Sequence, residues 1–160
     1  MKSAINNPPH TYSEWVLLID KLMEQSDDLS LLYAMKQGTL EWQSGVAERF
    51  TKRLMSTVNY RMNNAMNKFQ NEMAHSYGHE REIVRALLTL RKELKFLLDI
   101  VDLPAIPENI RHDLCQLIFN QAENIQMSLE KSAESDRSGK LLNIVRNNRI
   151  NIIEMGANDK

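Results

Sequence analysis

Cysteine, proline, glycine and aromatic residues are all scarce in this chain of 160 residues. The single cysteine, Cys115, excludes a framework of disulfide bonds within the chain. Four prolines, five glycines and an aromatic content of 6% supply few of the turns and large side chains that sandwiches and barrels use. Leu, Met, Glu, Lys and Arg are common instead, and these residues favour long helices. The composition therefore predicts an all-α protein.

A large net charge and a long apolar run are also missing. The formal net charge is -1, so the chain lacks the positive excess that by itself indicates nucleic-acid binding. No apolar stretch is long enough to span a bilayer, and the first residues contain no charged-then-apolar leader. We therefore expect a cytoplasmic protein with no membrane partner. A length of 160 residues suits a single domain.

The stretch from 80 to 103 predicts a central helix. Its main apolar seam repeats at steps of four and three, which is the pattern of a helix that buries one face. The residues of this seam are Ile83, Leu87, Leu90, Leu94, Leu97 and Val101. Leu88 and Phe96 lie off the seam, so the helix should contact partners on more than one side. A longer helix opens at Thr39, and a reversal at 75–79 would join the two as a long antiparallel hairpin.

Start and stop signals define the helices near the N-terminus. Thr11 and Glu14 match a capping box, which would start the first helix after a mobile arm at residues 1–10. A short helix from Leu29 to Gln37 should end at Gly38 in a left-handed cap. The residues expected to face inward from this short helix are Leu29, Leu32, Tyr33 and Met35.

The C-terminal third contains two further helical segments. Pro107 suits the first turn of a long helix, and residues 135–139 form a polar linker. A last helix is expected over 140–155, followed by a tail at 156–160. The complete pattern predicts one helical domain over 1–160, with a core at 11–134 and five to six helices arranged as a bundle.

Motifs for catalysis are missing from the sequence. Ser, His and Asp residues are scattered without a nucleophile elbow, and no glycine-rich loop is placed to hold phosphate. Glu72 and His75 form a single Glu-x-x-His unit, whereas a di-metal site in a bundle needs two such units and further carboxylates. Cys115 flanks an apolar stripe and is expected to pack rather than react. We therefore expect no catalytic residue, metal, cofactor or small-molecule ligand.

Surplus apolar residues on the central and final helices predict a binding role. A simple hairpin cannot bury all of them, and association with another chain would cover the remainder. This favours a non-enzymatic protein–protein interaction or regulatory module that works as a homodimer, with another protein as a further candidate partner. The candidate interaction surface consists of Leu88, Phe96, Ile150 and Ile153.

A basic, amide-rich face near the C-terminus supports an alternative, a DNA- or RNA-binding regulator. Residues 137–160 contain five Lys or Arg against two acidic residues. Cations of this kind can contact phosphates while amides read base edges, although a polar helix surface has the same composition. The candidate nucleic-acid contacts are Lys140, Arg146, Asn147, Arg149 and Asn151.

Overall fold

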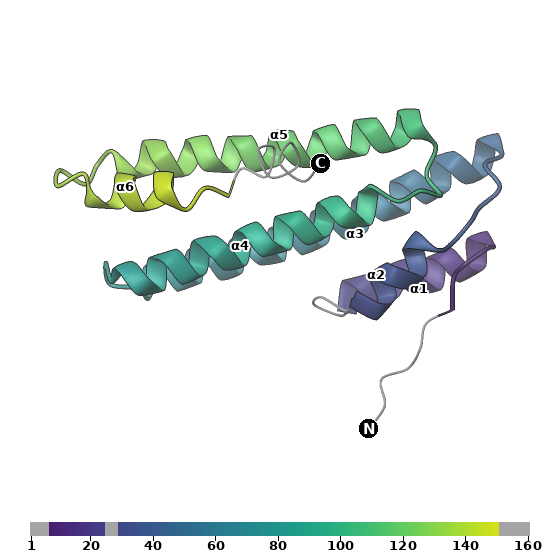
Figure 1. The fold of residues 1–160 in the computed structure, drawn as a ribbon, viewed down its shortest axis with the longest axis horizontal. Coiled ribbons are helices and arrows are strands. Elements are labelled where there is room, and N and C mark those ends of the chain that lie inside the picture. The colour runs from purple at the N-terminus through teal and green to yellow at the C-terminus, as the bar shows by residue number, and fades with distance from the viewer. Residues whose placement is uncertain (1–6, 25–28, 151–160) are drawn as a thin grey trace, which may run out of the picture. The chain divides into compact units, whose positions relative to one another are not determined.

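The computed structural model describes residues 7–24 and 29–150 of the chain. Over these residues it contains six α-helices and no strand, which confirms the all-α class and the bundle of five to six helices. No helix in these ranges is long and apolar enough to cross a membrane. The helices shown in Figure 1 are α1 Tyr12–Glu24, α2 Leu29–Lys36, α3 Ser44–Ala74, α4 Glu80–Val101, α5 Glu108–Ala133 and α6 Lys140–Asn147.

The helices form two compact units. Unit 1 consists of Met1–Arg61 and Phe96–Cys115, and unit 2 consists of Met62–Lys95 and Gln116–Lys160. The divisions fall inside α3, α4 and α5, so each of these three helices contributes residues to both cores. The single domain expected over 1–160 stays a prediction.

The capping box that starts α1 is confirmed. The backbone N–H of Glu14 donates to Thr11 Oγ1 at 3.2 Å, and the Glu14 carboxylate accepts from the N–H of Thr11 at 3.1 Å. The N–H of His10 donates to the same carboxylate at 2.9 Å. The side chains of Thr11 and Glu14 thus each pair the backbone N–H of the other residue, as a capping box requires.

The segment directly before α1 is held by other parts of unit 1. Pro9 is buried, and its carbonyl accepts from the N–H of Thr39 at 2.9 Å. The His10 ring bonds the Thr39 hydroxyl at 2.8 Å. Pro9 and His10 are therefore fixed by contacts with Thr39. The mobile arm expected over 1–10 stays a prediction, and residues 1–6 lie outside the described part of the chain.

Gly38 follows α2, but it does not have the expected left-handed backbone. Gly78 and Gly139 are the glycines with positive φ in the described ranges. A Cβ on Gly38 would lie 2.7 Å from Trp15 Cζ2 and 2.8 Å from Pro9 Cδ. Glycine is therefore required here because the indole ring and the proline approach the backbone closely.

The long helix begins at Ser44, five residues later than the sequence indicated. The backbone of Thr39 is already used, because its carbonyl accepts from Trp15 Nε1 at 2.8 Å. Trp42 also lies outside the helix, and its Nε1 donates to the carbonyl of Ala105. The Phe50 ring contacts both indoles edge to face, at centroid distances of 5.4 Å and 5.0 Å. These contacts tie the loop before α3 into the core of unit 1.

A five-residue reversal joins α3 to α4 and confirms the antiparallel hairpin. Tyr77 and Gly78 have φ of 51° and 78°, which turn the chain in two steps. Ser76 is buried, and its hydroxyl donates to the carbonyl of Met73 at 2.7 Å. The predicted seam of α4 is buried throughout, from Ile83 to Val101.

The last helix is shorter than expected, because α6 ends at Asn147 rather than at residue 155. Asn148 leaves the helical region with φ −125° and ψ 57°. Its backbone N–H and its side-chain amide both donate to the carbonyl of Ile144, at 3.1 Å and 2.9 Å. These two hydrogen bonds to one carbonyl close the end of the helix. The remaining expected helical residues and the tail lie outside the described part of the chain.

Candidate functional site

The candidate interaction surface is only partly exposed. Leu88 on α4 is 45% exposed, whereas Phe96 is 6% exposed and Ile150 is fully buried. Ile153 lies outside the described residues. Phe96 and Ile150 are core side chains of this chain, so the expectation that they form an exposed binding surface is corrected. Leu88 alone of the three is accessible to a partner.

Phe96 is buried because an arginine covers its ring. The guanidinium carbon of Arg61 lies 4.7 Å from the ring centroid, and Arg61 Nη1 donates to the carbonyl of Leu22 at 3.1 Å. Both partners belong to unit 1. A cation over an aromatic face is attracted by the ring quadrupole, which is stronger where water is excluded. The sequence of α4 alone could not predict that Phe96 is buried, because Arg61 lies on a different helix.

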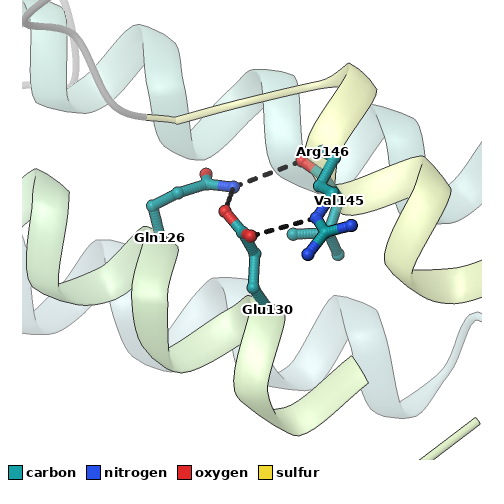
Figure 2. Close-up of polar contacts among 4 residues, drawn as sticks. All are labelled: Gln126, Glu130, Val145 and Arg146. Carbon is teal, nitrogen blue, oxygen red and sulfur yellow. Dashed lines mark hydrogen bonds and ion pairs between the residues drawn. The ribbon is translucent and has the colours of Figure 1, made fainter. Parts of the chain in front are cut away.

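Ile150 is held by a polar cluster between α5 and α6, which we call the Gln126 cluster and which consists of Gln126, Glu130, Val145, Arg146 and Ile150. Gln126 is 1% exposed, and its Nε2 donates to Glu130 Oε2 at 2.9 Å and to the Val145 carbonyl at 3.4 Å. Its Oε1 accepts from the N–H of Ile150 at 2.9 Å. Figure 2 shows Gln126 and Glu130 reaching from α5 toward α6. One buried amide therefore fixes both α6 and the segment that follows it.

The basic face near the C-terminus is partly neutralised by neighbouring carboxylates. Arg146 is 57% exposed but pairs with Glu130, with 3.2 Å between Nε and Oε1. Hydrogen bonds from Gln126 and then Arg146 lower the pKa of Glu130 below its usual 4.5, and the charge of Arg149 acts in the same direction. Glu130 therefore stays ionised and offsets the positive charge that phosphate binding would need.

The other predicted nucleic-acid contacts are Lys140, Asn147 and Asn151. Lys140 is exposed, and its charge acts on Asp136, whose carboxylate accepts from the N–H of Leu141 at 2.9 Å. Asn147 is exposed at the end of α6, and Asn151 lies outside the described residues. The structure brings Arg146 and Arg149 near one acid, Glu130.

An exposed apolar pair on α2 was missed by the sequence prediction. Leu29 and Tyr33 are 71% and 67% exposed, although both were expected to face inward. They lie one turn apart, on the side of the helix opposite to the buried residues. The buried residues of α2 are Leu31, Leu32, Ala34 and Met35. Leu17 on α1 is also turned away from the core and is 63% exposed.

Residues with catalytic or metal-binding chemistry are engaged in local structure. His75 follows the last residue of α3, and its Nδ1 bonds the carbonyl of Asn71 at 2.7 Å. Burial and the charge of Asp102 raise the pKa of the Cys115 thiol to about 11, so it stays protonated at neutral pH. Within residues 7–24 and 29–150 no group of three or more His, Cys, Asp or Glu is arranged to hold a metal ion.

A groove of about 510 Å³ lies between α3 and α5 in unit 1. Its floor is apolar, and its charged lining residues are Glu48, Lys52 and Asp113. The volume is within the range of small-molecule sites, but mixed charges on an apolar floor do not define a ligand class. The expectation of no small-molecule ligand stays a prediction.

Comparison with known proteins gives no relative. No protein-family model, no curated protein and no solved structure matches the chain.

Proposed function

We propose that this protein is a non-enzymatic helical interaction or regulatory module that binds other proteins through exposed helix faces. The single observation that carries the proposal is the exposed pair Leu29 and Tyr33 on α2. Large apolar side chains one turn apart on a helix are the anchors by which helical surfaces bind partners. Lys36, one turn further along the same face, adds a polar edge.

We also propose that a second copy of the chain is one of these partners. The proposal is supported by the number of large apolar side chains in solvent, which include Leu17 besides the α2 pair. A homodimer that covers such residues is the commonest oligomer of soluble proteins. The single Cys115, with its protonated thiol, is compatible with the cytoplasmic location that we propose.

The test compares wild type with the double variant Leu29→Ser plus Tyr33→Ser. Both proteins are used for partner capture from the native host with mass spectrometry, and both are measured by light scattering at micromolar concentration. We expect the double variant to lose the enriched partner and the dimer, because the two anchors supply the apolar contact.

Leu117→Ser plus Met127→Ser is the matched control. Leu117 and Met127 lie on α5 and are also exposed, at 41% and 60%. This control should bind like the wild type. A wild-type protein that stays monomeric and captures no partner would contradict the proposal. Equal losses in both double variants would assign the effect to general surface polarity rather than to α2.

The alternative proposal, a DNA- or RNA-binding regulator, has a separate test. If Arg146 and Arg149 contact phosphates, changing both to Ala should weaken binding and reduce the log-log salt slope by about one unit per lost contact. A gel shift of the wild type at low salt is the first measurement. Binding that is unchanged in the double variant would remove α6 from this proposal. Nucleic-acid binding is the second candidate function because Arg146 is already paired with Glu130.

A further inference from the structure

Four side chains of α4 form a straight exposed stripe in unit 2, which we call the α4 stripe. They follow one another at steps of four, three and four, and these eleven steps along the helix make slightly more than three full turns. All four therefore point in the same direction over roughly 16 Å of helix. The residues are Arg81, Arg85, Leu88 and Lys92, and each is exposed.

The α4 stripe is positively charged around one apolar side chain. No acidic residue lies on it, and Leu88 at its centre is 45% exposed. Glu82 beside the stripe makes a long ion pair with Arg85, with 3.8 Å between Oε2 and Nη1 and both side chains largely in solvent. An exposed pair of this kind contributes little to stability, so Arg85 can exchange Glu82 for a carboxylate of a partner.

We propose that the α4 stripe binds an acidic amphipathic helix of a partner protein. Leu88 would enter the apolar seam of that helix, and carboxylates on either side of the seam would pair with Arg81, Arg85 and Lys92. The inference rests on the proposed interaction module and deepens it by giving the chemistry of one partner. Its residues lie on a different helix from the α2 pair.

The central leucine favours a protein helix over a phosphate surface. Nucleic-acid backbones offer phosphates to the three cations but nothing apolar to Leu88. A lipid surface binds amphipathic helices through a broad apolar face, which one leucine does not provide. A helix with apolar residues at the same four and three spacing, flanked by acids, complements both features.

The size of the α4 stripe sets the expected strength of binding. Three turns of helix bury less area than a standard interface, which is about 1,600 Å² in total. Three exposed cations are also screened by salt, with a Debye length of about 10 Å at 0.1 M. The complex should therefore be transient, with an affinity that falls as salt is added.

The test uses a labelled synthetic helical peptide with a leucine seam at steps of four and three and glutamates on both sides. Binding to the full chain is measured by fluorescence anisotropy at low and moderate salt. We expect Leu88→Ser and the double variant Arg81→Gln plus Arg85→Gln each to weaken binding by about tenfold. Circular dichroism of each variant checks that the helices are intact.

Matched controls lie elsewhere in unit 2. Met127→Ser removes an exposed apolar side chain, and Lys68→Gln plus Lys131→Gln removes two exposed cations. Both controls should bind the peptide like the wild type. No measurable binding by the wild type, or equal losses in the controls, would overturn the inference. Stripe-dependent binding to a DNA duplex or to anionic vesicles, with none to the peptide, would overturn it in favour of a phosphate surface.

Failure of this inference is distinguishable from failure of the proposed function. If the peptide does not bind but the α2 variant still loses its partner, the interaction module stands and only the acidic helix is overturned.

Discussion

At the scale of single residues, the buried side chain of Gln126 makes three hydrogen bonds, to Glu130, Val145 and Ile150. We predict that Gln126→Ala destabilises the protein by about 2 kcal/mol, because the carbonyl of Val145 and the N–H of Ile150 lose their buried partner. Urea unfolding measures the loss. Hydrogen exchange of the Ile150 amide should become faster in the same variant, since its acceptor is gone.

Gln116→Ala is the control for this prediction. Gln116 lies on the same helix, and its amide donates only to the exposed Asn120 side chain at 3.1 Å. We expect this change to lower the free energy of unfolding by less than about 0.5 kcal/mol. Equal losses of unfolding free energy in the two glutamine variants would show that the buried hydrogen bonds of Gln126 do not add to stability.

Two glycines give a second prediction at the residue scale, with opposite signs. Gly38→Ala should destabilise the protein by about 1–3 kcal/mol, because the new methyl group would collide with Trp15 and Pro9. Gly45→Ala should instead stabilise it, by up to about 1 kcal/mol, since no heavy atom lies within 4 Å of its Cβ position in α3. Thermal unfolding of both variants checks this. A stabilised Gly38→Ala protein would contradict the close approach.

At the scale of helices, the capping box of α1 provides the third prediction. Thr11→Ala should cost about 1 kcal/mol, because the N–H of Glu14 loses its acceptor. Chemical unfolding measures the change, and Ser13→Ala, an exposed position in the same turn, serves as the control. A loss from Ser13→Ala as large as that from Thr11→Ala would refute the role of the cap.

The same cap has a pH dependence with a defined sign. Hydrogen bonds from the N–H groups of His10 and Thr11 lower the pKa of Glu14 below its usual 4.5. The unfolded chain thus binds this proton more tightly than the folded chain, and stability rises with pH in this range. The contribution is present above pH 4.5 and is lost as the pH falls through the lowered pKa. Glu14→Gln should therefore show a flatter loss of stability in acid.

The buried faces of some helices could be predicted from the sequence, and those of others could not. The seam of α4 was predictable because its apolar residues repeat at one helical period, with polar residues between them. The exposed face of α2 was not, because its first seven residues contain six that are apolar or aromatic, so the period does not select a side. The buried state of Phe96 was equally hidden, since Arg61 comes from another helix.

The same limit applies to the candidate site. Leu88 was predicted because it lies off the buried seam of α4, and that seam can be recognised from its spacing alone. Ile150 was assigned to a surface because its aliphatic side chain lies near the end of an apolar pattern. Its actual burial depends on a hydrogen bond from its own backbone to Gln126, which no side-chain pattern encodes.

At the scale of the whole molecule, we predict a single unfolding transition. Three helices contribute to both units, so loss of one core removes support from helices that build the other. Both tryptophans, Trp15 and Trp42, belong to unit 1, so their fluorescence reports on unit 1 while circular dichroism reports on all helices. The two urea curves should coincide. Separate midpoints would show that the single domain expected over 1–160 is incorrect.

The division of the chain also bears on how such a protein can evolve. Each unit is assembled from two stretches that are separated in sequence, and the second stretch of unit 1 interrupts unit 2. Genetic recombination and gene fusion transfer contiguous pieces, and no single contiguous piece encodes either unit alone. We therefore expect descendants of this gene to inherit both units together, and a duplication that copies one of them to carry a fragment of the other.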